Sequence, residues 1–219
     1  MLRLLILFSF VNLVVGTGAF VVSGILGIIS ADLQVSVSAA GQAMTAYAMA
    51  TALLAPLMLV LTRKLSRKHA LLLALAVFAL GNLVCVFATQ LSVLLAGRVL
   101  MGVGAVFTPI AAGIAVAGTE PARRGRALSI VFLGMSLSYA VGLPLGAWLG
   151  FRYGWQAPIA LVAGLATVAA LAVLVLVPAG THSGDTGFAG LAGVLRRADV
   201  RGTLLLTLLY FAAIFCVFA

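Results

Sequence analysis

The stretch LLILFSFVNLVVGTGAFVVSGILGII, from Leu4 to Ile29, decides the fold class of this chain. It contains no charged residue. It is also longer than the roughly twenty apolar residues that a helix needs to cross a bilayer core about 30 Å thick. Surface helices of soluble proteins keep a strongly polar face, which this stretch lacks. It therefore predicts a membrane-spanning helix.

Further stretches of the same kind follow along the chain. The predicted spans after the first are 40–61, 70–88, 91–118, 127–150 and 155–177, and a seventh begins near Gly202. The composition is 64% hydrophobic and only 8% charged, which leaves too little polar surface for a soluble protein. The apolar runs are continuous, whereas strands of a membrane barrel alternate apolar and polar residues. We expect an all-α, polytopic membrane protein with a six-helix transmembrane bundle and a partial seventh helix.

The composition changes once, after the sixth span, and this change predicts the domain organisation. Residues 1–178 form the N-terminal bundle, 179–201 a polar and basic cytoplasmic linker, and 202–219 the truncated start of a second bundle. No polar residue flanks the last apolar run, although finished spans carry interfacial anchors. We therefore expect the missing C-terminal half, or a second copy, to supply another bundle. A cleaved signal peptide is a weaker interpretation of the N-terminus, because the first apolar run is too long for one.

The basic residues predict the orientation in a cell membrane, the inner membrane in bacteria. With the N-terminus in the cytoplasm, 11 of the 13 Lys and Arg residues lie inside, Arg152 lies outside and Arg98 lies within a span. This bias follows the positive-inside rule. The linker would be cytoplasmic and Val35 outside. The net charge of +9 is then explained by topology and does not indicate nucleic-acid binding.

The sequence offers no catalytic or cofactor-binding constellation. It contains no phosphate-binding GxxxxGK[ST] loop, and His69 and His182 are isolated, so neither an enzyme, a cofactor nor a metal site is expected. Cys85 and Cys216 lie inside apolar runs and are interpreted as small core residues. The expected partners are the lipid bilayer and a small-molecule substrate.

Four motifs, in order and at the right span numbers, resemble the Major Facilitator Superfamily, most closely its bacterial arabinose-efflux and drug/proton antiporter branch. They are LTRKLSRKHALLLALAVFALGN (61–82), LLAGRVLMGVGAVF (94–107), EPARRGRALSIVF (120–132) and VGLPLGAWLGFRYGW (141–155). The resemblance covers essentially the whole chain. It implies a secondary transporter, most simply an efflux permease for a drug-like or sugar-like solute, that works by alternating access.

The sequence departs from the family pattern at three places. Arg63 stands where the basic loop usually has aspartate, and Leu143 and Ala147 interrupt the usual glycines around Pro144. Ala19 stands where members of this branch often have glutamate, which puts proton coupling in doubt. The alternative function is a non-transporting half-transporter, or a membrane partner subunit, that needs a second bundle.

Polar residues in spans 1, 2, 4 and 5 are the candidates for a substrate cavity, because the resemblance makes these the inner helices. The candidates are Asn12, Thr17, Ser23, Thr45, Tyr47, Thr108, Ser136 and Tyr139. Each is uncharged, and each could instead form a hydrogen bond between helices. As a set they indicate a mostly apolar cavity for lipophilic or neutral solutes.

Charged residues supply two further candidates. Arg98 is the intramembrane charge, and a charge inside the membrane needs a partner. Possible partners are backbone carbonyls, the hydroxyls of Thr17 or Ser23, or a water-filled cavity. Alternatively, the side chain could extend outward to the membrane surface. By the same resemblance, a cytoplasmic gate could form between Glu120 and four basic residues, Arg63, Lys64, Arg67 and Lys68; the simpler interpretation is that the basic residues only set topology.

Small residues recur every fourth position in span 5, so they share one helix face. The row comprises Gly134, Ser138, Gly142, Gly146 and Gly150, and Pro144 interrupts it and is expected to kink the helix. Such a face allows a second backbone to approach closely. It predicts either static packing between helices or a sliding seam against a second bundle.

Overall fold

The computed structural model describes residues 1–178, 193 and 196–218. The chain divides into two compact units, Met1–His182 and Ser183–Ala219. Among the described residues the regular elements are helices, with no strand. Six helical spans in this part of the chain are long and apolar enough to cross a membrane. The predicted all-α, six-span fold class is therefore confirmed.

Several spans are built from more than one helical segment. Span 1 comprises α1 (Leu2–Phe20), a 3-10 segment (Val21–Ile25) and α2 (Leu26–Asp32). Span 2 is α3 (Val37–Leu61) with a 3-10 turn (Thr62–Lys64), and span 3 is α4 (Arg67–Val86). Span 4 is α5 (Leu91–Gly104) followed by α6 (Phe107–Ala117). Span 5 comprises a 3-10 turn (Pro121–Arg123), α7 (Arg124–Leu137), a π-helical segment (Ser138–Gly142) and α8 (Leu143–Tyr153). Span 6 is α9 (Gln156–Leu176).

The second unit contains α11 (Ala198–Phe218), which begins a few residues before the start predicted for the seventh span. Most of the predicted linker, 179–201, lies outside the described residues. The side chain of Cys216 also lies outside them, whereas Cys85 is fully buried, as expected of a core residue.

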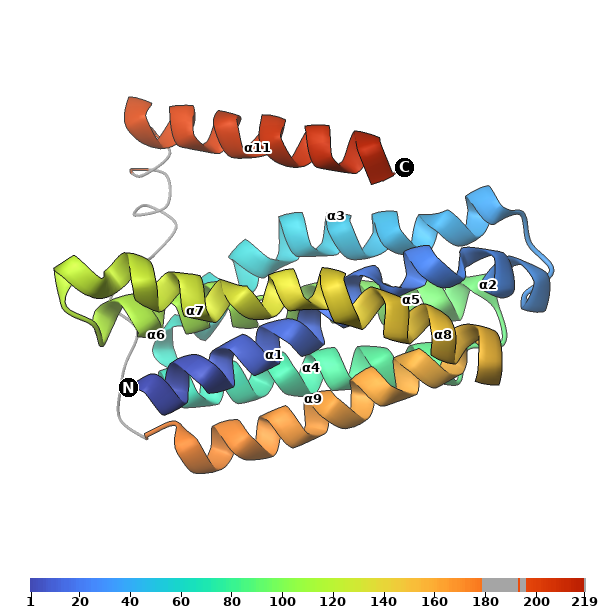
Figure 1. The fold of residues 1–219 in the computed structure, drawn as a ribbon, viewed down its shortest axis with the longest axis horizontal. Coiled ribbons are helices and arrows are strands. Elements are labelled where there is room, and N and C mark those ends of the chain that lie inside the picture. The colour runs from blue at the N-terminus through green and yellow to red at the C-terminus, as the bar shows by residue number, and fades with distance from the viewer. Residues whose placement is uncertain (179–192, 194–195, 219) are drawn as a thin grey trace. The chain divides into compact units, whose positions relative to one another are not determined.

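Span 1 is the central helix of the first unit. In its most apolar window 67% of the residues are buried, compared with 17% in span 2 and 22% in span 5. It packs along α7 and α9, while α4 packs between α5 and α9, and α3 packs along α5 (Figure 1). Spans 2 and 5 thus flank span 1 and are its most open neighbours.

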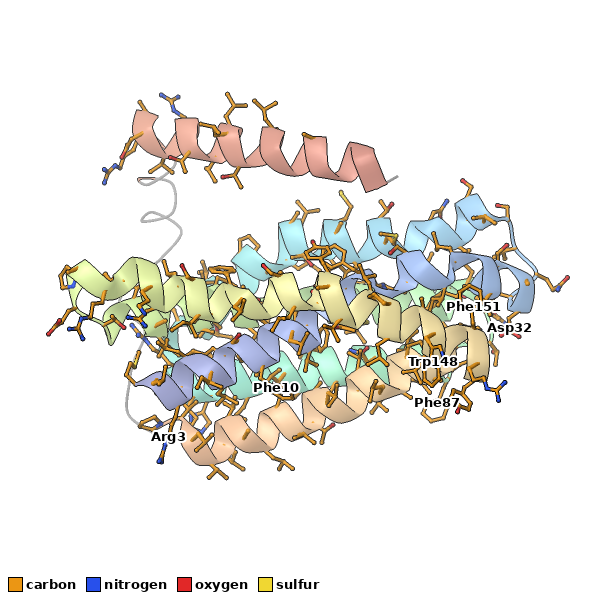
Figure 2. The ribbon with its side chains drawn as sticks, in the orientation of Figure 1. Arg3, Phe10, Asp32, Phe87, Trp148 and Phe151 are labelled. Atoms are coloured by element: carbon orange, nitrogen blue, oxygen red, sulfur yellow. The ribbon has the colours of Figure 1, made fainter. Side chains whose placement is uncertain are left out.

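The two ends of the bundle differ in character. Arg3 lies at one end, and Asp32, Phe87 and Phe151 lie at the other (Figure 2). Phe87, Trp148, Phe151 and Tyr153 are all more than half exposed. The rings of Trp148 and Tyr153 meet edge to face, 6.1 Å apart. Exposed aromatic rings are typical of the membrane–water interface.

The small residues of span 5 form the contact surface with span 1. All five residues of the row are buried. A Cβ atom added to Gly134 would collide with the backbone carbonyl oxygen of Ser9, and Gly142, Gly146 and Gly150 face the side chains of Thr17, Val21 and Ile25. The row is therefore enclosed within the first bundle. Its contacts favour the static-packing interpretation over the predicted seam against a second bundle.

The irregularity of span 5 has a local cause in Pro144. Proline lacks the amide hydrogen that would bond to the carbonyl four residues earlier, and its ring crowds that carbonyl. Pro144 is the second residue of α8, and the five residues directly before α8 form the π-helical segment. The interruption predicted at Pro144 thus takes the form of a π-helical segment, a rare form of backbone that occurs mostly as a single-turn bulge inside an α-helix.

We expect Gly134→Ala to destabilise the bundle, because the new methyl group would meet a backbone atom that cannot move aside. Overpacking of this kind costs about 1–3 kcal/mol. Gly164→Ala is the matched control, since a Cβ at Gly164 meets nothing within 4 Å. Unfolding of both variants in increasing SDS measures the difference, and equal midpoints would contradict a close contact at Gly134.

We also expect the loop at Ala122 to be cytoplasmic and the loop at Thr89 to be external, as the distribution of basic residues predicts. Both residues are exposed. A membrane-impermeant maleimide added to intact spheroplasts should label Thr89→Cys, and should label Ala122→Cys only after the membrane is permeabilised. The reverse pattern would overturn the orientation.

Candidate functional site

Arg98 is the charged residue at the centre of the candidate site. It lies in α5 and is only 1% exposed. Glycines on both sides of it let α5 approach its neighbours: a Cβ on Gly97 would lie 2.8 Å from the carbonyl of Gly81, and one on Gly102 would lie 2.7 Å from that of Tyr47. The close approach brings the guanidinium within reach of the backbone of other spans.

The guanidinium donates hydrogen bonds to three backbone carbonyls. Nε donates to Ala43 at 3.1 Å, Nη1 to Gly18 at 2.7 Å and Nη2 to Ala19 at 2.6 Å. Gly18 and Ala19 lie in the last turn of α1, where carbonyl groups lack partners within the helix and carry its negative partial charge. The planar fork of arginine suits two adjacent acceptors. Arg98 therefore connects spans 1 and 2 to span 4.

Tyr47 completes the surroundings of Arg98. The guanidinium carbon lies 4.8 Å from the centre of the Tyr47 ring, which is a cation–π contact. Within the described residues no carboxylate pairs with Arg98. Of the partners that the sequence left open, the backbone carbonyls are the ones observed. The hydroxyls of Thr17 and Ser23 instead donate to Leu13 and Phe20, each at 2.7 Å.

Asn12 and Thr108 join helices and are not available to a solute. The Thr108 hydroxyl donates to Asn12 Oδ1 at 2.7 Å, and Asn12 Nδ2 donates to the carbonyl of Val131 at 2.9 Å. These bonds connect α1, α6 and α7, and Asn12 is fully buried. Thr17 is likewise occupied, because it packs against Gly142.

The other candidates, Ser23, Thr45, Ser136 and Tyr139, are all exposed in spans 1, 2 and 5. We call these four exposed polar residues the polar strip. The Tyr139 ring contacts the Phe20 ring, with centroids 4.8 Å apart and planes at 32°. Sequence reasoning missed Phe20, because a phenylalanine in an apolar run gives no signal of its own.

Three members of the polar strip have uncommitted hydroxyl groups. Several Ser and Thr hydroxyls in these helices bond back to a carbonyl four residues earlier, as Thr51 does to Tyr47. No such bond, nor any other, is present for the side chains of Thr45, Ser136 and Tyr139 within the described part of the chain. Since polar groups are costly in lipid, their position favours a surface that meets solute, water or protein.

The predicted cytoplasmic gate is not assembled in this structure. The Glu120 carboxylate lies 3.9 Å from Arg123 Nε, and both side chains are 78% exposed. No ion pair joins Glu120 to Arg63, Lys64, Arg67 or Lys68 in the described residues. The gate between these four residues and Glu120 therefore stays a prediction, beside the topological explanation.

A polar contact at the opposite end was not predicted. The indole nitrogen of Trp155 donates to Asp32 Oδ2 at 2.6 Å, and Gln156 Nε2 lies 3.4 Å from the same oxygen. Asp32 ends span 1 and Trp155 precedes span 6, so this contact connects the two spans at the end of the bundle away from Arg3. In the sequence, Asp32 is a single acidic residue in a loop, and this alone does not indicate that it bonds to Trp155.

A second hollow in the described part of the first unit is small and apolar. A groove between α1, α8 and α9 has a volume of about 90 Å³ and an almost wholly apolar lining that includes Leu13 and Pro158. Ligand pockets usually measure about 300–1,000 Å³, so this groove is too small for a drug-sized solute. Among the described residues no group of His, Cys, Asp and Glu could hold a metal ion.

Comparisons with known proteins agree with this architecture. The model of the Major Facilitator Superfamily matches residues 8–219. The inner membrane transport protein YdhP of Escherichia coli K12 is 29% identical over 93% of this chain and 53% of its own length. The chloramphenicol resistance protein of Streptomyces lividans is 34% identical over 75% of this chain and 42% of its own length. This chain thus spans about half the length of the curated relatives it matches.

A solved structure shows the same fold. The human organic anion transporter MFSD10 (TETRAN) superposes with a TM-score of 0.63, covering 80% of this chain and 47% of that protein, at 18% sequence identity. At this identity the likeness concerns the fold alone.

We expect Arg98→Lys to weaken the bundle, because an ammonium group cannot reproduce the fork that reaches three carbonyls on two spans. Each charge-assisted hydrogen bond lost costs about 1.5–3 kcal/mol. Arg152→Lys is the control, since Arg152 is exposed in the last turn of α8. The SDS concentration at which half of the protein is unfolded should fall for Arg98→Lys and stay unchanged for Arg152→Lys. An unchanged midpoint for Arg98→Lys would contradict the structural role.

Proposed function

The chain belongs to the Major Facilitator Superfamily, a family of multi-pass membrane transporters and not of enzymes, and we propose that it forms the N-terminal half of a secondary active efflux permease. The permease would reside in the inner membrane with its N-terminus in the cytoplasm. The observation that carries the proposal is the arrangement at Arg98, where one buried guanidinium ties spans 1, 2 and 4 together.

The solute is a small lipophilic or neutral molecule. The polar strip supplies a few hydroxyl groups and one aromatic ring, that of Tyr139, and in the described part of the first unit no carboxylate lies in the interior of a span. Such a surface offers orientation through single hydrogen bonds and little to hold a metal ion or a multiply charged solute. The name of the Streptomyces relative fits a drug-like solute of this kind.

Alternating access is the mechanism we propose for the whole transporter. Three spans that contribute to the site change helix type along their length: span 1 at 21–25, span 4 at 105–106 and span 5 at 138–142. Interrupted helices are common near the substrate site of secondary transporters, where one bundle moves against the other. The tie through Arg98 would keep spans 1, 2 and 4 moving as one body.

The driving carboxylate for proton coupling lies outside residues 1–178. A proton-driven antiporter needs a group in the membrane that gains and loses a proton. Ala19 stands at the position where this branch often has glutamate, and Arg98 stays protonated. Asp32 and Glu120, the acids of the first bundle, are exposed at helix ends. The alternative is a facilitator without proton coupling.

The second candidate function is a half-transporter or membrane partner subunit that does not transport alone. The residue that favours it is Ala19, which stands where the resembling branch often has glutamate. In that case a second copy of the chain would supply the other bundle.

We expect the 219-residue chain, reconstituted alone in proteoliposomes, not to move chloramphenicol in response to a pH gradient. The physical reason is the absence of a titratable carboxylate within the six described spans. If the reading frame continues beyond Ala219, the longer protein should drive gradient-dependent flux. Protein-free liposomes and liposomes with the gradient collapsed by an ionophore are the controls. Robust gradient-driven flux by the 219-residue chain would refute the coupling argument.

A further inference from the structure

We propose that one end of the first unit, the end that carries Arg3, is a binding surface for the headgroups of anionic phospholipids. We call this end the basic surface; its eight members are Arg3, Arg63, Lys64, Arg67, Lys68, Arg123, Arg124 and Arg126. Such binding goes beyond the transport function proposed above and would hold whether or not the protein moves a solute.

Three separate segments of the chain build the basic surface. They are the first turn of α1, the connection between α3 and α4, and the connection between α6 and α7 with the first turn of α7. The N-terminus and both connections lie at the same end of the first unit (Figure 1). A Cβ on Gly118 would lie 2.8 Å from Met1 Cε, so the start of α1 packs against the connection between α6 and α7. Basic residues that are distant in sequence are thus gathered at one end.

Most side chains of the basic surface have no partner in the described part of the chain. Arg123 Nε lies 3.9 Å from the Glu120 carboxylate, and Arg124 Nε donates to the carbonyl of Thr119 at 3.3 Å. The other six side chains form neither a hydrogen bond nor an ion pair with any described residue. Their charged groups are therefore free to bind an anion from outside the protein.

The protein does not neutralise the charge of this end. Among the described residues of the first unit the acids are Asp32 and Glu120, and Asp32 lies at the opposite end (Figure 2). Eight basic residues thus face one carboxylate, whose side chain is itself 78% exposed. The first turns of α4 and α7 hold Arg67 and Arg124 but no acid, so these charges add to the positive ends of the helix dipoles. Like charges gathered in this way repel each other, and a bound anion relieves the repulsion.

The depth of the basic surface places it beside the lipid headgroups. Span 2 ends at Lys64, span 3 begins at Arg67 and span 5 begins at Pro121. The 20 residues of span 3 extend about 30 Å as a helix, which is the thickness of the hydrocarbon core. Basic residues at the ends of such spans therefore lie at the boundary between acyl chains and headgroups, where their long side chains reach the phosphate layer.

Apolar surface next to the charges favours a lipid over a soluble anion. Leu61, just before the connection between α3 and α4, is 63% exposed, and Leu65, within that connection, is 39% exposed. They alternate with Arg63, Lys64 and Arg67 along the chain. A molecule with a negative headgroup and an acyl chain matches both kinds of surface, whereas an inorganic anion matches only one.

The topological explanation of these residues makes a different prediction. The positive-inside rule concerns the direction in which spans insert and sets no preference among lipids once the protein is in the membrane. A basic segment at an anionic membrane surface is instead attracted to it, by about fivefold in partitioning for each Lys or Arg. A measured preference for anionic lipid would therefore separate a binding surface from a purely topological one.

The first test uses the unmodified protein. The 219-residue chain is reconstituted in phosphatidylcholine bilayers with a trace of spin-labelled phosphatidylglycerol or spin-labelled phosphatidylcholine, and electron paramagnetic resonance measures the fraction of label immobilised at the protein. We expect phosphatidylglycerol to associate at least about twofold more strongly, averaged over a lipid shell of which only part meets the basic surface. In about 1 M NaCl the ratio should fall toward one, because salt screens the charges. Equal association of the two lipids at low salt overturns the proposal.

The second test changes the charges. Combined replacement of Arg123, Arg124 and Arg126 by Gln should lower the association ratio, whereas their combined replacement by Lys keeps the charge and should preserve it. Arg152→Gln, in the last turn of α8, removes a basic residue outside the basic surface and should leave the ratio unchanged. An unchanged ratio in the Gln variant, or an equal loss in Arg152→Gln, would contradict the location assigned to the lipid.

A third measurement separates a lipid headgroup from a free phosphate ion. Inorganic phosphate is added to the unmodified protein and compared with chloride at the same ionic strength. We expect the same association ratio in both salts, because screening is then equal. Loss of the phosphatidylglycerol preference in phosphate alone would identify a site for the soluble ion and overturn the assignment to lipid. All these measurements are made without a solute, so a failure of the transport function would not change them.

Discussion

Close backbone approach is the constraint on which this bundle depends. Lipid tails are as apolar as the side chains, so helices in a bilayer gain no hydrophobic stabilisation by associating, and packing between small residues takes its place. The contact of Gly134 with the Ser9 carbonyl and that of Gly97 with Gly81 are the clearest cases. They allow span 1 to occupy the centre of the first unit and α5 to lie directly against α4.

The site follows from that packing. Because spans 1, 2 and 4 approach closely, one guanidinium reaches carbonyl groups on two neighbouring spans. The cost of burying its charge is offset by those dipoles and by the Tyr47 ring. Ala19 is fixed by this contact, and Phe20 follows it in the chain at the point where α1 gives way to a 3-10 segment. The position of the ring that meets Tyr139 is thus coupled to the arginine.

The sequence predicted those features that depend on residue order alone. Runs of apolar residues predicted all six spans. Small residues at every fourth position of span 5 placed Gly134 and Gly146 on one helix face, as observed. Arg98 was identified because a charge within an apolar run is rare. Contacts between distant residues could not be read in this way. Asn12 and Tyr139 are both polar residues in apolar runs, yet Asn12 is sealed between helices and Tyr139 is open.

The contact between Asp32 and Trp155 has an optical consequence. The chain contains two tryptophans, Trp148 and Trp155, on either side of the turn between spans 5 and 6. Trp155 is 1% exposed with its indole bound to a carboxylate, whereas Trp148 is 58% exposed. The intrinsic ultraviolet emission of the protein therefore arises from one end of the bundle, from two fluorophores in contrasting surroundings. An aqueous quencher would reduce the fluorescence of Trp148 more than that of Trp155. The emission of Trp155 would then report whether spans 1 and 6 remain in contact.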